Sequence, residues 1–176
     1  EQKSFEEKNN NITNNINLAR MVITDDIPPS DPKDRIIPQI ENKDSAKVLV
    51  VKHYKKAIDI FPDFYGPIAD LSNYYILEAQ PDSAFVYLLD ATRLKPKEWL
   101  HHYYLGLIYY ERNNYSEALG YFEKIILNET LQERSTDFPE LLEAYEFAAR
   151  CLHNTGKDQE AYAYLEEGIQ IFNMKS

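Results

Sequence analysis

The chain has 176 residues, a length that ordinarily forms one domain and can bury a core without disulfides or metal ions. Its 29 acidic residues outnumber its 19 basic residues and give a net charge of −10, which opposes binding to nucleic-acid phosphates. The single cysteine excludes an internal disulfide, and no apolar run is long enough for a transmembrane helix. We therefore expect a folded domain with no nucleic-acid partner and no direct membrane insertion of this segment.

The N-terminal 43 residues contain the first predicted helix. Its apolar residues recur at helical intervals: Ile12, Ile16, Ala19 and Ile23. A proline-containing segment follows at roughly residues 25–43, where Pro32 and Pro38 disfavour a continuous helix. We predict that residues 1–43 are an N-terminal extension that completes a degenerate first repeat, shields the binding groove, or does both.

Residues 44–62 are predicted to form the second helix of that first repeat. This segment is the basic part of an otherwise acidic chain, because four lysines face two aspartates: Lys47, Lys52, Lys55 and Lys56 against Asp44 and Asp59. A solvated helix face explains this charge as well as a docking face for an acidic partner does.

The next two segments, residues 65–98 and 99–132, align with each other at a spacing of 34 residues, from Tyr65 to Trp99. Small residues recur at equivalent positions, including Ser72 and Gly106, and Ala84 and Ala118. Large apolar residues alternate with them: Leu71 and Leu105, Tyr75 and Tyr109, Leu88 and Phe122. Small residues let two helices approach closely while large residues fill the gaps around them, so each segment predicts an antiparallel helix hairpin.

A third such segment, residues 142–175, follows after about nine additional residues. It repeats the pattern with Tyr145, Ala148, Ala149 and Leu152 in its first helix and Ala161, Leu165 and Gly168 in its second. Gly156 is predicted to form the turn between the two helices. The single cysteine, Cys151, lies in an apolar helical run, where a buried and inert thiol is expected.

The 34-residue spacing and the matched small and large positions resemble the tetratricopeptide repeat family. Residues 44–62 fit the second helix of its pattern, and Leu18, Ala19 and Val22 fit the first. The resemblance implies an all-α fold of antiparallel helix hairpins stacked in a right-handed superhelix, an α-solenoid. The predicted tetratricopeptide domain covers residues 44–176.

The resemblance also implies a non-catalytic scaffold that binds a peptide or protein on its concave face. The positions that line this groove in the family, and that carry aromatic or polar side chains here, are Asp70, Asn73, Tyr103, Tyr104, Leu107, Tyr110, Phe147, Arg150 and His153. The alternative is that Tyr103, Tyr104 and Phe147 pack between neighbouring repeats or against the N-terminal segment.

Some family members hold a C-terminal carboxylate through a clamp of Lys, Arg and Asn side chains. This chain departs from that clamp, because Ala69, Tyr103 and Glu146 stand at the position where the clamp needs a lysine. The binding of chaperone tails by that route is therefore in doubt.

Nothing in the sequence predicts catalysis. The histidines, at positions 53, 101, 102 and 153, lack metal-binding spacing, and no phosphate-binding or nucleophile motif occurs. We expect no catalytic residue, no metal and no cofactor, and an enzyme is only a minor alternative.

Two further expectations concern assembly and context. Little sequence follows the last helix to cover Leu165, Ile169 and Phe172, which predicts a homodimer through the C-terminal helix. An alternative function is the soluble repeat region of a larger envelope or membrane-associated protein that positions another domain. That arrangement is suggested only by bacterial tetratricopeptide proteins and would place the segment outside the cytoplasm of a bacterium, whereas the residues leave the compartment open.

Overall fold

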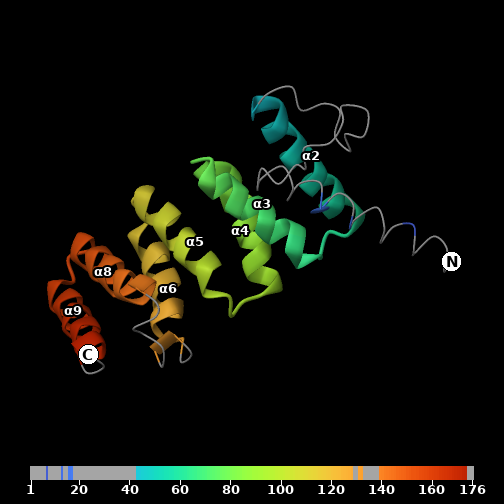
Figure 1. Cartoon of the computed structure of the whole chain (residues 1–176). Helices are drawn as coiled ribbons and strands as arrows, with labels where there is room; N and C mark the ends of the chain where they lie inside the picture. Colours follow the sequence, from blue (N-terminus) through green and yellow to red (C-terminus); the bar gives the residue numbers. More distant parts are fainter. Residues whose placement is uncertain are drawn as a thin grey trace. The chain divides into compact units, whose positions relative to one another are not determined.

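The computed structural model describes residues 7, 13, 16, 17, 43–128, 131–132 and 139–173. These residues form α-helices and no strand, so the predicted all-α class is confirmed for the part of the chain described (Figure 1). The helices are α2 Lys43–Ile60, α3 Tyr65–Leu77, α4 Pro81–Leu94, α5 Trp99–Glu111, α6 Tyr115–Ile126, α8 Pro139–Asn154 and α9 Asp158–Asn173.

The chain divides into two compact units, Glu1–Gln80 and Pro81–Ser176. In the first unit α2 packs against α3, as the basic helix predicted at residues 44–62 requires. Tyr54 and Ala57 of α2 are buried, and Lys47 forms an ion pair with Glu78 beyond the end of α3. The exposed lysines of α2 lie on its solvent side: Lys52, Lys55 and Lys56.

Most of the N-terminal extension lies outside the described residues. Residues 7, 13, 16 and 17 are helical, and Ile16 is buried, as the predicted first helix requires. The other residues that predicted this helix, and the proline-containing segment at 25–42, fall among the positions not described. The role of residues 1–43 stays a prediction.

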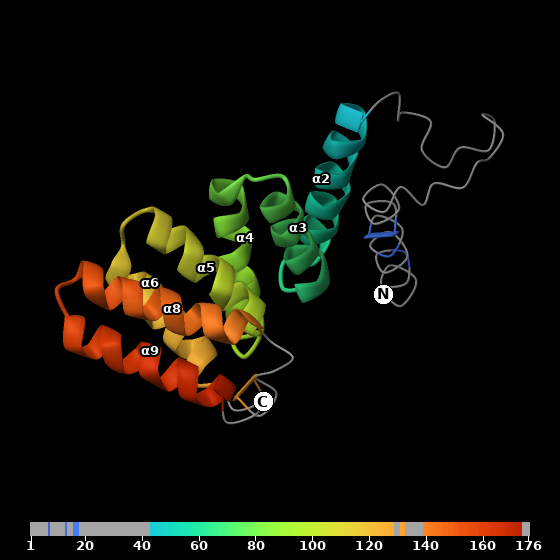
Figure 2. The same cartoon turned by 60° about the vertical axis from the view of Figure 1, so that its left-hand side comes forward.

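In the second unit each helix packs against the next one along the chain: α4 on α5, α5 on α6, α6 on α8, and α8 on α9 (Figure 2). The main core cluster lies where α6 and α8 meet. Its fully buried members include Ala118, Phe122 and Ile125 of α6 and Leu141 and Tyr145 of α8. Two helix hairpins, α5–α6 and α8–α9, therefore share one core.

The small residues are buried at the places where paired helices approach. Gly106 of α5 lies so close to α6 that a Cβ atom there would stand 2.8 Å from the Phe122 ring. Gly168 of α9 faces Tyr145 in the same way, with a Cβ-to-Cβ approach of 3.0 Å. The predicted exchange of small and large side chains between paired helices is confirmed in both hairpins.

The first helix of each predicted repeat ends in the same turn. Ala79, Asn113 and Gly156 have φ values of 53°, 59° and 79°, in the left-handed region. The following amide in each case donates to a carbonyl five residues earlier, at 2.9 Å: Gln80 to Tyr75, Asn114 to Tyr109, and Lys157 to Leu152. This is the Schellman helix end, and it confirms the turn predicted at Gly156.

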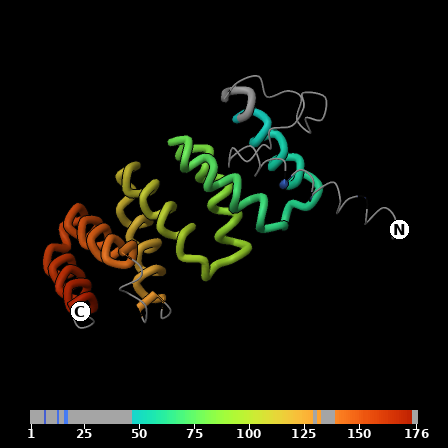
Figure 3. The backbone as a smooth tube through the Cα atoms, viewed as in Figure 1, coloured from blue at the N-terminus to red at the C-terminus, as the bar shows by residue number. Residues whose placement is uncertain are grey.

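The predicted repeat boundaries agree with the helix starts at Tyr65 and Trp99. The repeat at 65–98 comprises α3 and α4, which belong to different units, so their pairing stays a prediction. Figure 3 shows the tube of α8 turning back through residues 155–157 into α9, as a helix hairpin does.

Candidate interaction surfaces

Four aromatic rings lie next to one another on α5 and α8 of the second unit, and we call them the aromatic surface: Tyr103, Tyr104, Tyr110 and Phe147. The Tyr103 and Tyr104 rings meet edge-to-face with centroids 5.6 Å apart, and the Tyr110 and Phe147 rings do so at 5.3 Å. All four side chains are partly buried. The structure thus brings together predicted groove residues from two different repeats.

The inner side of this surface belongs to the core. Phe147 stacks on buried Phe122 with centroids 5.3 Å apart, and Tyr103, Leu107 and Tyr110 also pack against the cluster between α6 and α8. Packing between repeats, the alternative expected from the sequence, therefore describes one side of these rings. Tyr104 lies outside that cluster and is the ring least committed to the core.

Carboxylates line the edge of the aromatic surface. The Tyr103 hydroxyl donates to Glu143 of α8, and burial together with this hydrogen bond raises the pKa of Tyr103 above its ordinary value. The Arg150 guanidinium lies 5.3 Å from the Phe147 ring centroid and is paired with Glu146. Because the only nearby cation is shared with a carboxylate, this edge does not resemble a clamp for a C-terminal carboxylate.

Three of the predicted groove residues stand apart from this surface. Asp70 and Asn73 are partly buried on α3 in the first unit, and their place in a common groove stays a prediction. His153 lies near the end of α8, where its Nδ1 is 2.6 Å from the Asp158 carboxylate of α9.

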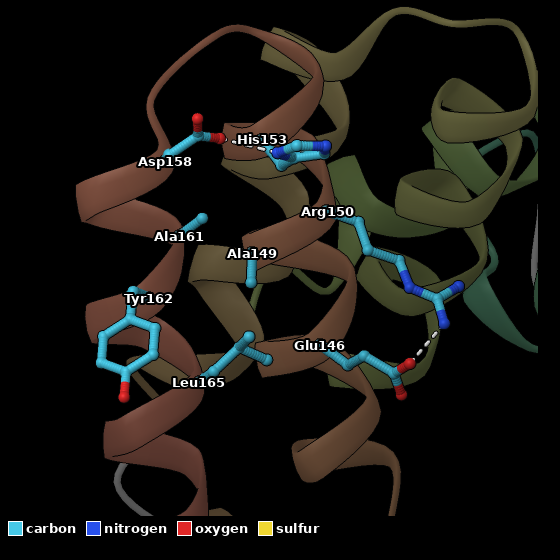
Figure 4. A pocket seen from close by; sticks show the side chains of 8 residues that line it. All are labelled: Glu146, Ala149, Arg150, His153, Asp158, Ala161, Tyr162 and Leu165. Atoms are coloured by element: carbon cyan, nitrogen blue, oxygen red, sulfur yellow. Dashed lines mark hydrogen bonds and ion pairs between the residues drawn. The ribbon is translucent and has the colours of Figure 1, made fainter.

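A second concave feature, which we call the end groove, lies between α8 and α9 and has a volume of about 500 Å³. Its lining residues are Glu146, Ala149, Arg150, His153, Asp158, Ala161, Tyr162 and Leu165. Figure 4 shows the two alanines between the helices, the His153–Asp158 pair across one end, and Tyr162 and Leu165 along α9. Arg150 and His153, predicted for the peptide groove, thus line this feature.

The buried histidines are structural groups. His101 and His102 are 1% and 3% exposed, and burial lowers the pKa of His101 to about 4. His102 Nε2 lies 2.7 Å from the Pro96 carbonyl oxygen, where it donates a hydrogen bond. Both rings are neutral at neutral pH and form part of the α4–α5–α6 packing.

Burial also raises the pKa of the Cys151 thiol to about 11, which agrees with the inert thiol expected there. Within the described residues, no group of three His, Cys, Asp or Glu side chains is placed to hold a metal ion. In the same part of the chain, no helix combines the length and apolar character needed to cross a membrane.

Comparison with known proteins supports the sequence resemblance. Residues 102–128, which span α5 and α6, match the family model described as "Tetratricopeptide repeat". A search of curated proteins gives no significant match.

Solved structures show the same fold at low sequence identity. The structure titled "MamA MSR-1 C2" aligns over 100% of both chains with a TM-score of 0.60 and 11% identity. Another, titled "Crystal structure of MamA protein", aligns over 94% of this chain and 93% of that one, with a TM-score of 0.63 and 15% identity. These likenesses concern the helical-repeat fold alone.

Proposed function

We propose that this chain, an all-α helical-repeat protein with a tetratricopeptide repeat at residues 102–128, is an interaction scaffold that holds a peptide or protein on its aromatic surface. Tetratricopeptide repeats generally serve as non-catalytic protein-interaction modules, and the proposal assigns no catalytic role to this one. The concave-face position expected for the groove is part of the proposal.

The observation that supports this surface is the partial burial of its rings. Each of the four rings is held on one side by neighbouring rings or by the core, while part of it stays open to solvent. Rings held in this way lose little conformational entropy when a partner covers them, which is one reason why aromatic residues dominate binding hot spots.

The charges around the surface favour a partner that is apolar with basic flanks. Glu111, Glu143 and Glu146 are exposed at its edge, and the Arg150 charge is offset by Glu146. An acidic tail would meet these carboxylates, whereas lysine or arginine side chains beside an aliphatic or aromatic residue would pair with them.

The test uses a peptide selected from a random display library against the intact chain, with its affinity measured by titration calorimetry. Tyr104→Ala is the informative variant, because Tyr104 contributes least to the core. We expect it to weaken binding at least about fivefold, the loss typical of a hot-spot residue. Tyr162→Ala, a tyrosine that is 65% exposed on α9, is the matched control and should keep full affinity.

The two variants distinguish the aromatic surface from the end groove. A peptide whose affinity falls with Tyr162→Ala and not with Tyr104→Ala would place the binding site at the end groove and contradict the proposal. Helical circular dichroism of both variants should match that of the unaltered chain.

A further inference from the structure

The end groove is the equivalent, one repeat later, of a helix-covered face in the preceding hairpin. The turn residues Asn113 and Gly156 set the register between the two hairpins, 43 positions apart, since both end a first helix with the same hydrogen bonds. In that register the eight end-groove residues correspond to Tyr103, Gly106, Leu107, Tyr110, Tyr115, Ala118, Leu119 and Phe122.

In the α5–α6 hairpin these equivalent positions are covered. All of them except Gly106 belong to or pack against the core cluster that includes buried residues of α8, and Gly106 is itself buried. The α8 residues in that cluster recur at helical spacing: Leu141, Ala144, Tyr145, Ala148 and Cys151. A face of this type is therefore built to receive a helix.

In the α8–α9 hairpin the same face is open within the described structure. Leu165 is 41% exposed, although its equivalents Leu88 and Phe122 are fully buried. Two more apolar residues lie on the same side of α9, at helical spacing from Leu165: Tyr162 is 65% exposed and Ile169 is 55% exposed. We call these three residues the α9 ridge.

We propose that the α9 ridge and the end groove form a self-association face, and that a second copy of this chain covers it in a two-fold dimer. A ridge beside a groove is self-complementary under a two-fold axis, because the ridge of each copy enters the groove of the other. The occupant of the groove is then a helix, as in the preceding hairpin.

The charges of the groove are compatible with a second copy. Its rim carries two acids, Glu146 and Asp158, and two potentially basic groups, Arg150 and His153. These form ion pairs across or along the groove, Arg150 with Glu146 and His153 with Asp158. A rim that carries both signs does not repel its own copy, although the chain as a whole has a net charge of −10.

Sedimentation velocity over a concentration series tests the dimer. The unaltered 176-residue chain should associate reversibly to a dimer. Leu165→Glu puts a charge into the groove and should raise the dissociation constant at least about tenfold, since it removes the burial of a leucine. Val86→Glu is the control, because Val86 of α4 is also exposed, at 57%, and lies outside the groove and ridge.

Disulfide trapping gives a second readout that does not depend on one variant folding well. Ile169→Cys lies on the ridge and outside the groove lining, so oxidation of the folded protein should link two copies. The native Cys151 is buried and stays silent, and Val86→Cys should not cross-link above background.

Three results would overturn the proposal. A chain that stays monomeric up to concentrations on the order of 1 mM has no such dimer. A dimer that tolerates both Leu165→Glu and Ile169→Glu uses another surface. Open-ended oligomers would indicate head-to-tail contacts in place of a two-fold axis.

Discussion

At the scale of single residues, the turn after the first helix of each predicted repeat accepts three different amino acids. Glycine adopts positive φ without steric cost, and asparagine tolerates it, whereas alanine is strained by its Cβ atom. Ala79 nevertheless occupies this conformation at the end of α3, as Asn113 and Gly156 do at the ends of α5 and α8.

We therefore expect Ala79→Gly to stabilise the protein, by about 1 kcal/mol, because it removes the strain at φ 53°. Gly156→Ala should destabilise it by about the same amount, since it introduces that strain at φ 79°. Urea unfolding followed by circular dichroism measures both changes. Equal midpoints for the unaltered chain and both variants would show that these turns do not limit stability.

Residue identity predicted the turn at Gly156 and did not predict its counterparts at Ala79 and Asn113. The conformation at those two positions is imposed by the helices on either side, not by the side chain. Burial of the small and large repeat positions was predicted well, because the same spacing recurs in every hairpin and each position has one environment. Phe172, expected to be uncovered, instead packs against the core cluster.

At the scale of helix pairs, glycines separate close packing from simple helix propensity. Gly106 of α5 leaves no room for a methyl group, since Phe122 is fully buried and its ring is held by Phe147. Gly120 of α6 has no atom within 4 Å of a built Cβ.

Gly106→Ala should therefore destabilise the protein by about 1–3 kcal/mol, the usual cost of overpacking a rigid site. Gly120→Ala should stabilise it, by up to about 1 kcal/mol, because alanine is the better helix former. Thermal unfolding of the two variants should shift in opposite directions. A stabilising Gly106→Ala would mean that α5 and α6 are less tightly paired than described.

Helix pairing also explains which part of the candidate site the sequence could predict. Family positions place Tyr103, Tyr110 and Phe147 on one side of successive first helices, and the structure brings these rings into contact. The same positions treat every hairpin alike, whereas Arg150 and His153 belong to a hairpin whose outer face is open. The end groove follows from that missing neighbour, which no residue spacing reveals.

At the scale of the whole molecule, two surfaces on one helical scaffold are assigned to two kinds of partner. The aromatic surface is assigned to a peptide and the end groove to a second copy. They share α8, where Arg150 contacts Phe147 on one side and lines the groove on the other. A larger envelope or membrane-associated context stays a prediction, and it affects neither assignment.

The central claim is that α5 and α8 present the binding site, and chemical-shift mapping of the selected peptide on the isotope-labelled chain tests it most directly. The account predicts that the largest amide shifts fall on residues 103–110 of α5 and around Phe147 of α8. Shifts concentrated on Tyr162, Leu165 and the rest of α9, or on α2 and α3, would contradict it.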